Sequence, residues 1–419
     1  MRIAIAAAVV AAATLAQDSA REVVDRAADA MGGRDRILAV TSIDLQGEGT
    51  ATDIGEDSAP GGDPAQWIVS RFHERIELDS RRVRVSQRRT AKFLYPDNEQ
   101  WLDETRERLV ETLQHPVTIL RDALGGRSHA TLAVDETTNL PARATENVDD
   151  LVFGRVTVET AFDGYGEVDG LKLPSHFVTT IDGVVTFDFK AATISLNARE
   201  RFAGAPAATP PAPIMLTSKL LREGVWTIDG SDGYRSVVFE FADHLALFEL
   251  PWHPDRSKLA LDLAKTLSSK PLTQAIVPSH HPEHSGGLRA AVADGLTIVT
   301  HRDNVDYFRD RLVRGSFEAV PVGEELVLTD RSMEVQLRHV RDNPREQTNL
   351  VAYLPRHRLL IEAGLYDSQW HQHPWGPNIV WNLRGLAIDA VVPMHGPIET
   401  YAAVTARMRG RPHGVRPKF

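Results

Sequence analysis

Two patterns of apolar and polar residues divide the chain. From about residue 21 to residue 200, apolar and polar residues mostly alternate, as at residues 42–46, 67–72, 156–160 and 184–189. A period of two places every second side chain on the same face, so these runs predict β-strands with one buried face. Turns that contain glycine separate them, for example at residues 164–166. We therefore expect a curved antiparallel sheet.

The pattern changes after residue 213. Strand patterns at residues 236–241, 244–250, 275–277 and 296–300 are separated by helix patterns at residues 258–267, 287–293 and 305–312. Such alternation is typical of an α/β domain. Residues 201–213, between the two patterns, are rich in proline and alanine and predict an extended linker. We expect a smaller β-rich domain at 21–200, a linker at 201–213 and an α/β domain at 214–408.

The first 16 residues form a separate element. Arg2 is followed by an apolar run over residues 3–16 that ends in small residues. This order is typical of a secretory signal peptide, and the run is shorter than the ~20 residues that cross a bilayer. We expect residues 1–16 to be removed on export. The mature chain would then have no integral membrane segment and would lie in the periplasm or outside the cell.

Composition narrows the chemistry. The 419 residues include no cysteine, which excludes disulfides, thiolate ligands and a cysteine nucleophile. The net charge of -10 disfavours nucleic acid as a partner. The hydrophobic fraction of 42% is enough for ordinary globular cores. We expect a small-molecule substrate or an apolar ligand as the partner.

One short segment carries most of the candidate chemistry. Residues 279–287 read SHHPEHSGG and lie between a strand pattern and a helix pattern. Histidine and carboxylate side chains in such a cluster are typical metal ligands. The spacing resembles the H-x-H-x-D-H-x-G-G loop of the metallo-β-lactamase superfamily. His281, His284, Gly286 and Gly287 stand at the matching positions, whereas Ser279 and Glu283 replace the first histidine and the aspartate.

The resemblance extends over about residues 214–408. Residues 350–355 and 359–366 resemble the hairpin that carries two further family ligands, and residues 391–396 resemble the late strand that ends in a histidine. It implies the αββα sandwich of that superfamily. It also implies hydrolysis of a lactam, lactone, thioester or phosphoester, without selecting among them.

The first metal site that the resemblance implies is incomplete. Its ligands would be Ser279, His281 and Arg345. A catalytic zinc ion usually has three protein ligands, and a serine with a permanently charged guanidinium cannot complete such a set. We expect this site to be empty. Arg345 would bind a substrate carboxylate or phosphate, or form a salt bridge with Glu283 or Glu346. A loop shortened by one residue would instead make His280 a ligand.

The second implied site is better preserved. Its ligands would be Glu283, His284 and His395, and Gly364 stands where the family has a bridging aspartate. Two histidines and one glutamate form a known catalytic zinc set. Two outcomes stay open, a single zinc ion and a vestigial cluster without metal. Glu283 and Arg345 are the candidate catalytic residues, and His281, Glu283, His284 and His395 are the candidate metal ligands.

A loop after the hairpin supplies further candidates. His371, His373, Trp370 and Trp375 would overhang the site and, with His280, line a substrate pocket. The alternative is that they pack the loop against the domain. We therefore consider two functions. The first is a hydrolase with an atypical single-zinc site that acts on an ester, lactone or similar small substrate. The alternative is a non-catalytic exported binding or scaffolding protein on a metal-depleted fold.

Overall fold

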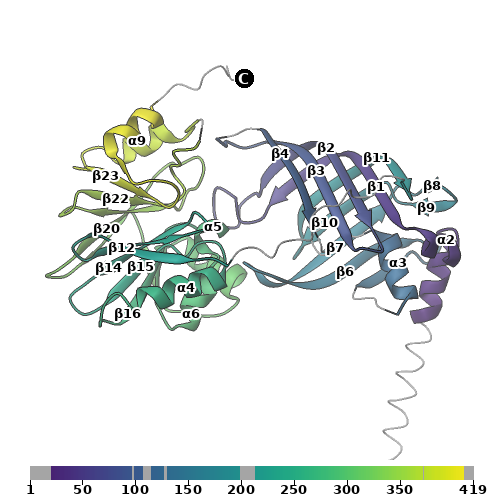
Figure 1. Ribbon diagram of the computed structural model, residues 1–419, viewed down its shortest axis with the longest axis horizontal. Helices are drawn as coiled ribbons and strands as arrows, with labels where there is room; N and C mark the ends of the chain where they lie inside the picture. The colour runs from purple at the N-terminus through teal and green to yellow at the C-terminus, as the bar shows by residue number, and fades with distance from the viewer. Residues whose placement is uncertain are drawn as a thin grey trace, which may run out of the picture.

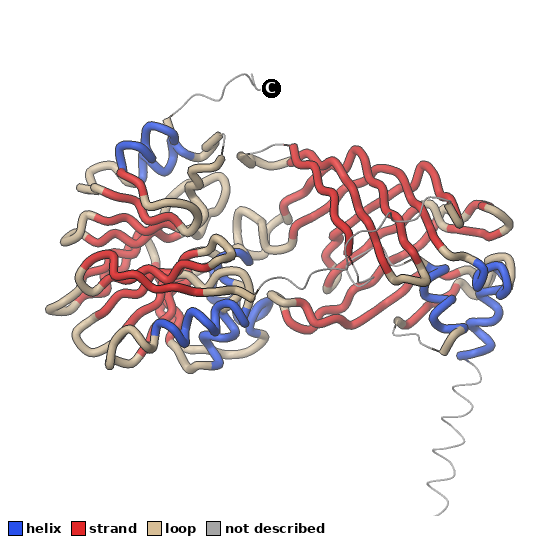
Figure 2. The backbone as a smooth tube through the Cα atoms, in the orientation of Figure 1, coloured by secondary structure: helices blue, strands red, loops and turns tan. Residues whose placement is uncertain are grey.

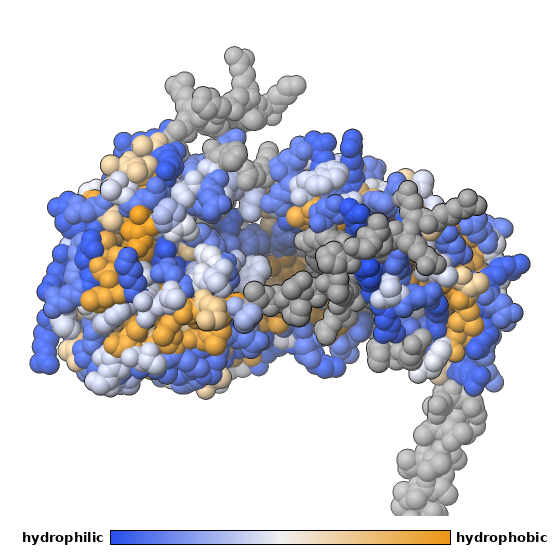
Figure 3. Space-filling model, viewed as in Figure 1, coloured by the Kyte–Doolittle hydropathy of each residue, from blue (hydrophilic) through white to orange (hydrophobic). Residues whose placement is uncertain are grey.

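The computed structural model describes residues 20–96, 99–106, 115–126, 130–198, 213–370 and 372–409. We call residues 20–198 the N-terminal half and residues 213–409 the C-terminal half. The expected signal peptide, the expected linker up to residue 212 and His371 lie outside the described residues. Among the residues that are described, no helix combines the length and apolar character required to cross a membrane. The face shown in Figure 3 is largely hydrophilic, with apolar patches over the C-terminal half.

A nine-stranded sheet, antiparallel throughout, makes up most of the N-terminal half (Figures 1 and 2). Its strand order is β4-β3-β2-β1-β11-β10-β7-β6-β5. The strands are β1 (Ser42–Asp53), β2 (Ala65–Glu77), β3 (Arg82–Ala91), β4 (Glu99–Arg106), β5 (Thr131–Val134), β6 (Pro141–Asp150), β7 (Gly154–Asp163), β10 (His176–Ile181) and β11 (Val184–Leu196). The strands β8 (Gly166–Val168) and β9 (Leu171–Leu173) pair separately. The expected antiparallel sheet is confirmed.

The core of this half forms because one face of the sheet is apolar. In β2, Trp67, Val69 and Phe72 are buried while Ile68 and Ser70 between them are exposed. The buried face packs against α2 (Arg34–Ala39), α3 (Pro116–Leu124) and a helix that includes residues 20–30.

The C-terminal half contains two sheets. The first has seven strands in chain order, β12 (Leu216–Arg222), β13 (Val225–Gly230), β14 (Arg235–Glu240), β15 (Leu245–Phe248), β16 (Leu272–Val277), β17 (Thr297–His301) and β18 (Ala319–Val322). The second has six, β19 (Glu325–Thr329), β20 (Glu334–His339), β21 (Leu350–Leu354), β22 (Leu359–Glu362), β23 (Ala390–Pro393) and β24 (Glu399–Thr400). Phe239 and Phe248 of the first sheet share one core with Leu337 and Ile361 of the second, so the sheets pack face to face.

Helices cover the outer faces of both sheets (Figure 1). On the first sheet lie α4 (Pro254–Ala264), α6 (Leu288–Ala293) and a π-helical turn, η2 (Phe308–Val313). On the second lie α8 (Gly376–Asn382) and α9 (Tyr401–Met408). Two shorter helices, α5 (Pro282–Ser285) and α7 (Asn304–Tyr307), follow β16 and β17 along the chain. The expected αββα sandwich, preceded by a β-rich region, is confirmed.

The two halves meet at the loop between β1 and β2, residues 54–64, which we call the β1–β2 loop. The backbone N–H of Gln347 donates to the Ser58 carbonyl at 2.6 Å. Gly55 has φ +82°, and a Cβ there would lie 2.9 Å from Cγ of Pro282. Only glycine combines this φ with so close an approach at low cost. The loop therefore reaches the start of α5, where the histidine cluster lies.

Candidate functional site

The histidine segment, residues 279–287, packs closely against the chain around Trp252 and Ser257. It leaves β16 at Val277, and Pro282 begins α5. A Cβ on Gly286 would lie 2.0 Å from the Trp252 carbonyl oxygen, and one on Gly287 would lie 2.0 Å from Oγ of Ser257. Both positions therefore need glycine for the segment to pack on the loop before α4 and on α4 itself.

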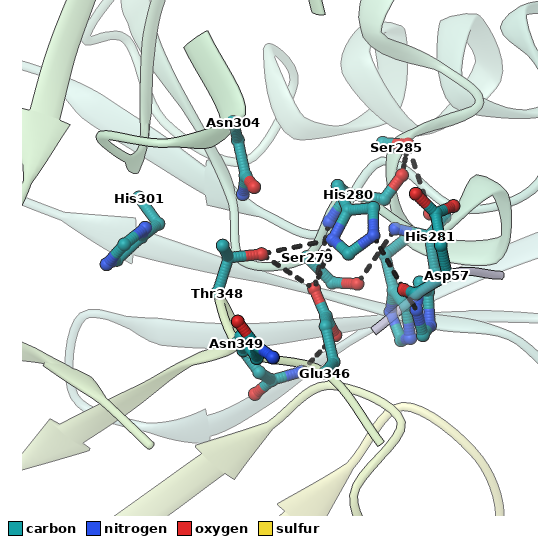
Figure 4. Close-up of polar contacts among 12 residues, drawn as sticks. Asp57, Ser279, His280, His281, Ser285, His301, Asn304, Glu346, Thr348 and Asn349 are labelled. Atoms are coloured by element: carbon teal, nitrogen blue, oxygen red, sulfur yellow. Dashed lines mark hydrogen bonds and ion pairs between the residues drawn. The ribbon is translucent and has the colours of Figure 1, made fainter. Parts of the chain in front are cut away.

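His280 is buried, and both of its ring nitrogens face oxygen atoms. Its Nε2–H donates to the Asp57 carbonyl at 2.9 Å, and its Nδ1 lies 3.1 Å from Oε1 of Glu346 and 3.0 Å from Oγ1 of Thr348 (Figure 4). Burial alone would lower the pKa of His280, but the Glu346 carboxylate outweighs burial and raises it. Since each ring nitrogen already lies within hydrogen-bond distance of an oxygen atom, neither is free to bind an ion.

His281 differs from His280 because one of its ring nitrogens has no hydrogen-bond partner among the described residues. Its Nε2–H donates to the same Asp57 carbonyl at 2.9 Å. Burial lowers the pKa of His281 to about 3, so the ring is neutral. With the proton on Nε2, the lone pair is on Nδ1. That atom is buried and has no hydrogen-bond partner among the described residues, and Oε2 of Glu56 lies 3.7 Å away.

His284 lies between two carboxylates. Its Nδ1 is 2.9 Å and 3.1 Å from the two oxygens of Glu249, and its Nε2 is 3.3 Å from Oε1 of Glu283. Burial would lower the pKa of His284, but Glu249 and Glu283 together hold it well above its usual value. Glu249 has φ +77°, a conformation that non-glycine residues seldom adopt without cost. Strain at Glu249 thus accompanies the contact that orients His284.

Arg345 joins Glu283 to a carboxylate of the N-terminal half. Its Nη2 lies 2.9 Å from Oε1 of Glu283 and 3.5 Å from Oε2 of Glu56. The Arg345 side chain is 8% exposed, whereas Glu56 and Glu283 are 24% and 23% exposed. Burial would raise the pKa of Glu283, but His284 and then Arg345 outweigh it and lower it. Of the two expected salt bridges, Arg345 forms the one to Glu283, while Glu346 pairs with His280.

The ligand atoms of the expected zinc site, Glu283, His284 and His395, do not lie close enough together to share one ion. Among the described residues, two groups bring three ligand atoms within 4.8 Å of one another: His280, His281 and Glu346, and Glu56, His281 and Glu283. Neither contains His284 or His395. Nδ1 of His395 lies 3.3 Å from the Gly233 carbonyl oxygen, and its ring packs edge-on against Tyr234 at 4.5 Å.

Gly364 leaves no room for the family's bridging carboxylate. Its φ is +64°, and a Cβ there would lie 2.4 Å from Nε2 of His284. Zinc therefore does not fit the set of Glu283, His284 and His395 as these side chains lie. A histidine and glutamate cluster that could bind a metal ion nevertheless exists at His281.

The described residues expected to line a pocket mouth pack against the C-terminal half and against one another. Trp375 is 1% exposed, and its Nε1–H donates to the Leu365 carbonyl at 2.8 Å. Trp370 packs edge-on against Trp375 at 5.4 Å. His373 stacks on Tyr366 at 5.1 Å, and its Nε2 lies 3.0 Å from the Asp367 carbonyl oxygen. These contacts favour the packing alternative for the three residues.

Three residues of this cluster were not expected from the sequence. Glu56 and Asp57 lie more than 220 positions before His280 and His281, in a loop without a recognisable motif. Glu249 follows the apolar strand β15 directly. A carboxylate at the end of a buried strand was a signal that could have identified Glu249. No comparable signal marked Glu56 or Asp57.

A groove lies on the N-terminal sheet. This groove of about 700 Å³ is lined by residues of β1, β2, β3, β4 and β11. Phe72 and Trp101 share its lining with the charged side chains of Glu48, Arg71 and Lys190. Its chemistry is mixed, with aromatic and charged groups together.

Comparisons with known proteins concern the fold. No protein-family model and no curated protein matches the chain. Among solved structures, a metallo-β-lactamase from Pontibacter korlensis is 16% identical with a TM-score of 0.41, covering 46% of this chain and 96% of its own. The metallo-β-lactamase FIM-1 from Pseudomonas aeruginosa, in a mono-zinc form, is 15% identical with a TM-score of 0.39, covering 46% and 94%. Likeness at this level does not extend to activity or ligands.

Proposed function

We propose that the protein is an exported hydrolase that acts on an ester, lactone or similar small substrate. The reaction would take place where Arg345 meets Glu283 and Glu56. One zinc ion is the proposed cofactor. Because Glu283, His284 and His395 do not gather into a zinc set, we assign no step of the reaction to the ion.

One observation carries the proposal. A guanidinium that is 8% exposed lies between two carboxylates that each remain about a quarter exposed. Fixed donors at a site shielded from water stabilise developing negative charge much better than donors in water. Hydrolysis of an acyl bond develops such charge on the carbonyl oxygen.

The roles of the two catalytic candidates follow from their contact. Arg345 would donate hydrogen bonds to the carbonyl oxygen of the substrate as negative charge develops there. Glu283 would orient Arg345 through the 2.9 Å ion pair. His284, held by Glu249 on its other side, would keep Glu283 in place.

The test is a survey of hydrolysis. The full-length protein, supplied with zinc, is assayed with 4-nitrophenyl acetate, a lactone, a thioester and a phosphodiester. Removing one donor to a developing oxyanion lowers kcat roughly 100- to 1,000-fold, so we expect that loss in Arg345→Gln. Arg356→Gln is the matched control, because Arg356 forms an exposed pair with Glu223. It should retain wild-type rates.

Two results would contradict the proposal. One is a wild-type protein that hydrolyses none of the four classes, which would favour the binding or scaffolding alternative. The other is an Arg345→Gln variant as active as Arg356→Gln. Export is tested separately, since the chain isolated from the periplasm or medium should begin near Gln17. An intact Met1 on exported protein would refute that part.

A further inference from the structure

We infer that a divalent metal ion binds between the two halves, held by Nδ1 of His281 and by the carboxylates of Glu56 and Glu283. This ligand set differs from the one that the sequence resemblance implies, because Glu56 belongs to the β1–β2 loop of the N-terminal half. The inference deepens the proposed function by assigning ligands to its ion.

His281 is set up as a ligand by a backbone carbonyl. The Asp57 carbonyl can only accept, so the 2.9 Å contact places the proton of His281 on Nε2. The lone pair of Nδ1 then points away from this hydrogen bond. Metal-bound histidines commonly donate their other ring N–H to a carbonyl or carboxylate in this way. A buried nitrogen without a partner among the described residues costs free energy unless something binds it.

The carboxylates of Glu56 and Glu283 complete the donor set. One carboxylate oxygen of Glu56, one of Glu283 and a ring nitrogen of His281 all lie within 4.8 Å of one another. Three protein ligands match the number found in catalytic zinc sites, which keep a further position for water. The nitrogen ligand favours zinc and similar transition metals over magnesium, which prefers oxygen ligands. Because both carboxylates are about a quarter exposed, an ion can reach them from solvent.

His280 cannot form the other candidate set. The group of His280, His281 and Glu346 would need a lone pair on His280. Nε2 of His280 donates to Asp57, and its Nδ1 faces Glu346. Of the two groups among the described residues, the one that includes Glu56 therefore remains.

Arg345 competes with the ion for the same two carboxylates. Its guanidinium lies 2.9 Å from Glu283 and 3.5 Å from Glu56, so its positive charge repels an ion that shares those carboxylates. Removing the positive charge should therefore strengthen ion binding. A cluster that only stabilises the fold would not gain an ion in this way.

The experiment is a zinc titration of the full-length, metal-free protein by calorimetry. We expect one equivalent to bind. His281→Ala and Glu56→Gln should each weaken binding at least 10-fold, and Arg345→Gln should tighten it at least 10-fold. Asp63→Asn, an exposed position in the same loop, and His301→Ala, outside the cluster, are matched controls that should bind as the wild type does.

A second readout uses thermal unfolding. An ion that binds only the folded state raises Tm, so zinc should raise the Tm of the wild type and of Asp63→Asn but not of Glu56→Gln. Failure of both the wild type and Arg345→Gln to bind zinc would overturn the inference. So would wild-type affinity in Glu56→Gln, which would place the ion elsewhere.

The outcomes for ion site and activity are separable. Zinc binding that depends on Glu56 and His281, without turnover of any ester, lactone, thioester or phosphodiester, would leave the ion site standing and refute the hydrolase. Hydrolysis by a wild-type protein that, like Arg345→Gln, binds no zinc would refute the ion site and leave the hydrolase standing.

Discussion

Glu362 offers a sharp test of the electrostatics around the site. It ends β22 and is buried at 2% exposure. Its Oε2 accepts hydrogen bonds from the backbone N–H groups of Leu365 at 2.7 Å and Tyr366 at 3.1 Å. Its Oε1 is buried without a hydrogen-bond partner among the described residues. Burial raises the pKa of Glu362 to about 8, although these backbone N–H groups work in the opposite direction.

The sign and size of the effect follow from the pKa. A carboxyl whose pKa is higher in the folded state binds more protons there than in the unfolded chain, so stability falls as pH rises from about 4.5 to about 8. At about 1.4 kcal/mol for each pH unit, the accumulated loss at pH 7 is about 3 kcal/mol. Glu362→Gln keeps an acceptor for both N–H groups and removes the titration. It should therefore stabilise the protein near pH 7 and much less at pH 4.5.

The assay compares Tm of Glu362→Gln and of the wild type at pH 4.5, 6 and 7.5. The Tm difference should grow with pH. Glu325→Gln serves as the control, because Glu325 is 39% exposed in a surface pair with Arg338, and such pairs contribute little to stability. A difference for Glu362→Gln that stays constant or shrinks as pH rises would refute the reasoning.

Three further predictions concern the same region. Gly364→Asp should lower Tm and should not add an ion ligand, because its Cβ would lie 2.4 Å from Nε2 of His284; unchanged Tm with a newly bound ion would contradict this. Glu249→Ala leaves Nδ1 of the buried His284 without its partner and should lower the free energy of unfolding in urea by about 3 to 5 kcal/mol, and a loss below about 1 kcal/mol would show that the pair is unimportant. Trp375→Ala should lower the free energy of unfolding by about 3 to 5 kcal/mol, whereas Trp381→Ala should lower it much less, because Trp381 is 46% exposed. Equal losses in the two variants would argue against the packing role of Trp375.

The fold was largely predictable because its signals are local. Alternation at residues 67–72 predicts a strand with one buried face, and these residues lie in β2 with Trp67, Val69 and Phe72 buried. The α/β pattern after residue 213 likewise predicted the strands and helices of the two-sheet half. Hydrophobic periodicity carries this information because it decides which face of each element is buried.

The site was only partly predictable because its contacts are long-range. The pattern of residues 279–287 located the histidine cluster, and the Arg345 to Glu283 salt bridge was one of two alternatives. The insertion of Glu56 and Asp57 depends on how the N-terminal half meets α5, which no local pattern encodes. The orientation of His284 depends on Glu249 at φ +77°, and a motif gives the order of ligands without their rotamers.

Metal content tests the central claim most directly. The full-length protein is purified without a histidine tag, and zinc is measured by elemental analysis beside His281→Ala, Glu56→Gln and Arg345→Gln. The account predicts close to one equivalent in the wild type, no less in Arg345→Gln and almost none in the other two variants. A wild type and an Arg345→Gln variant that both lack metal, or equal zinc in all four proteins, would contradict it.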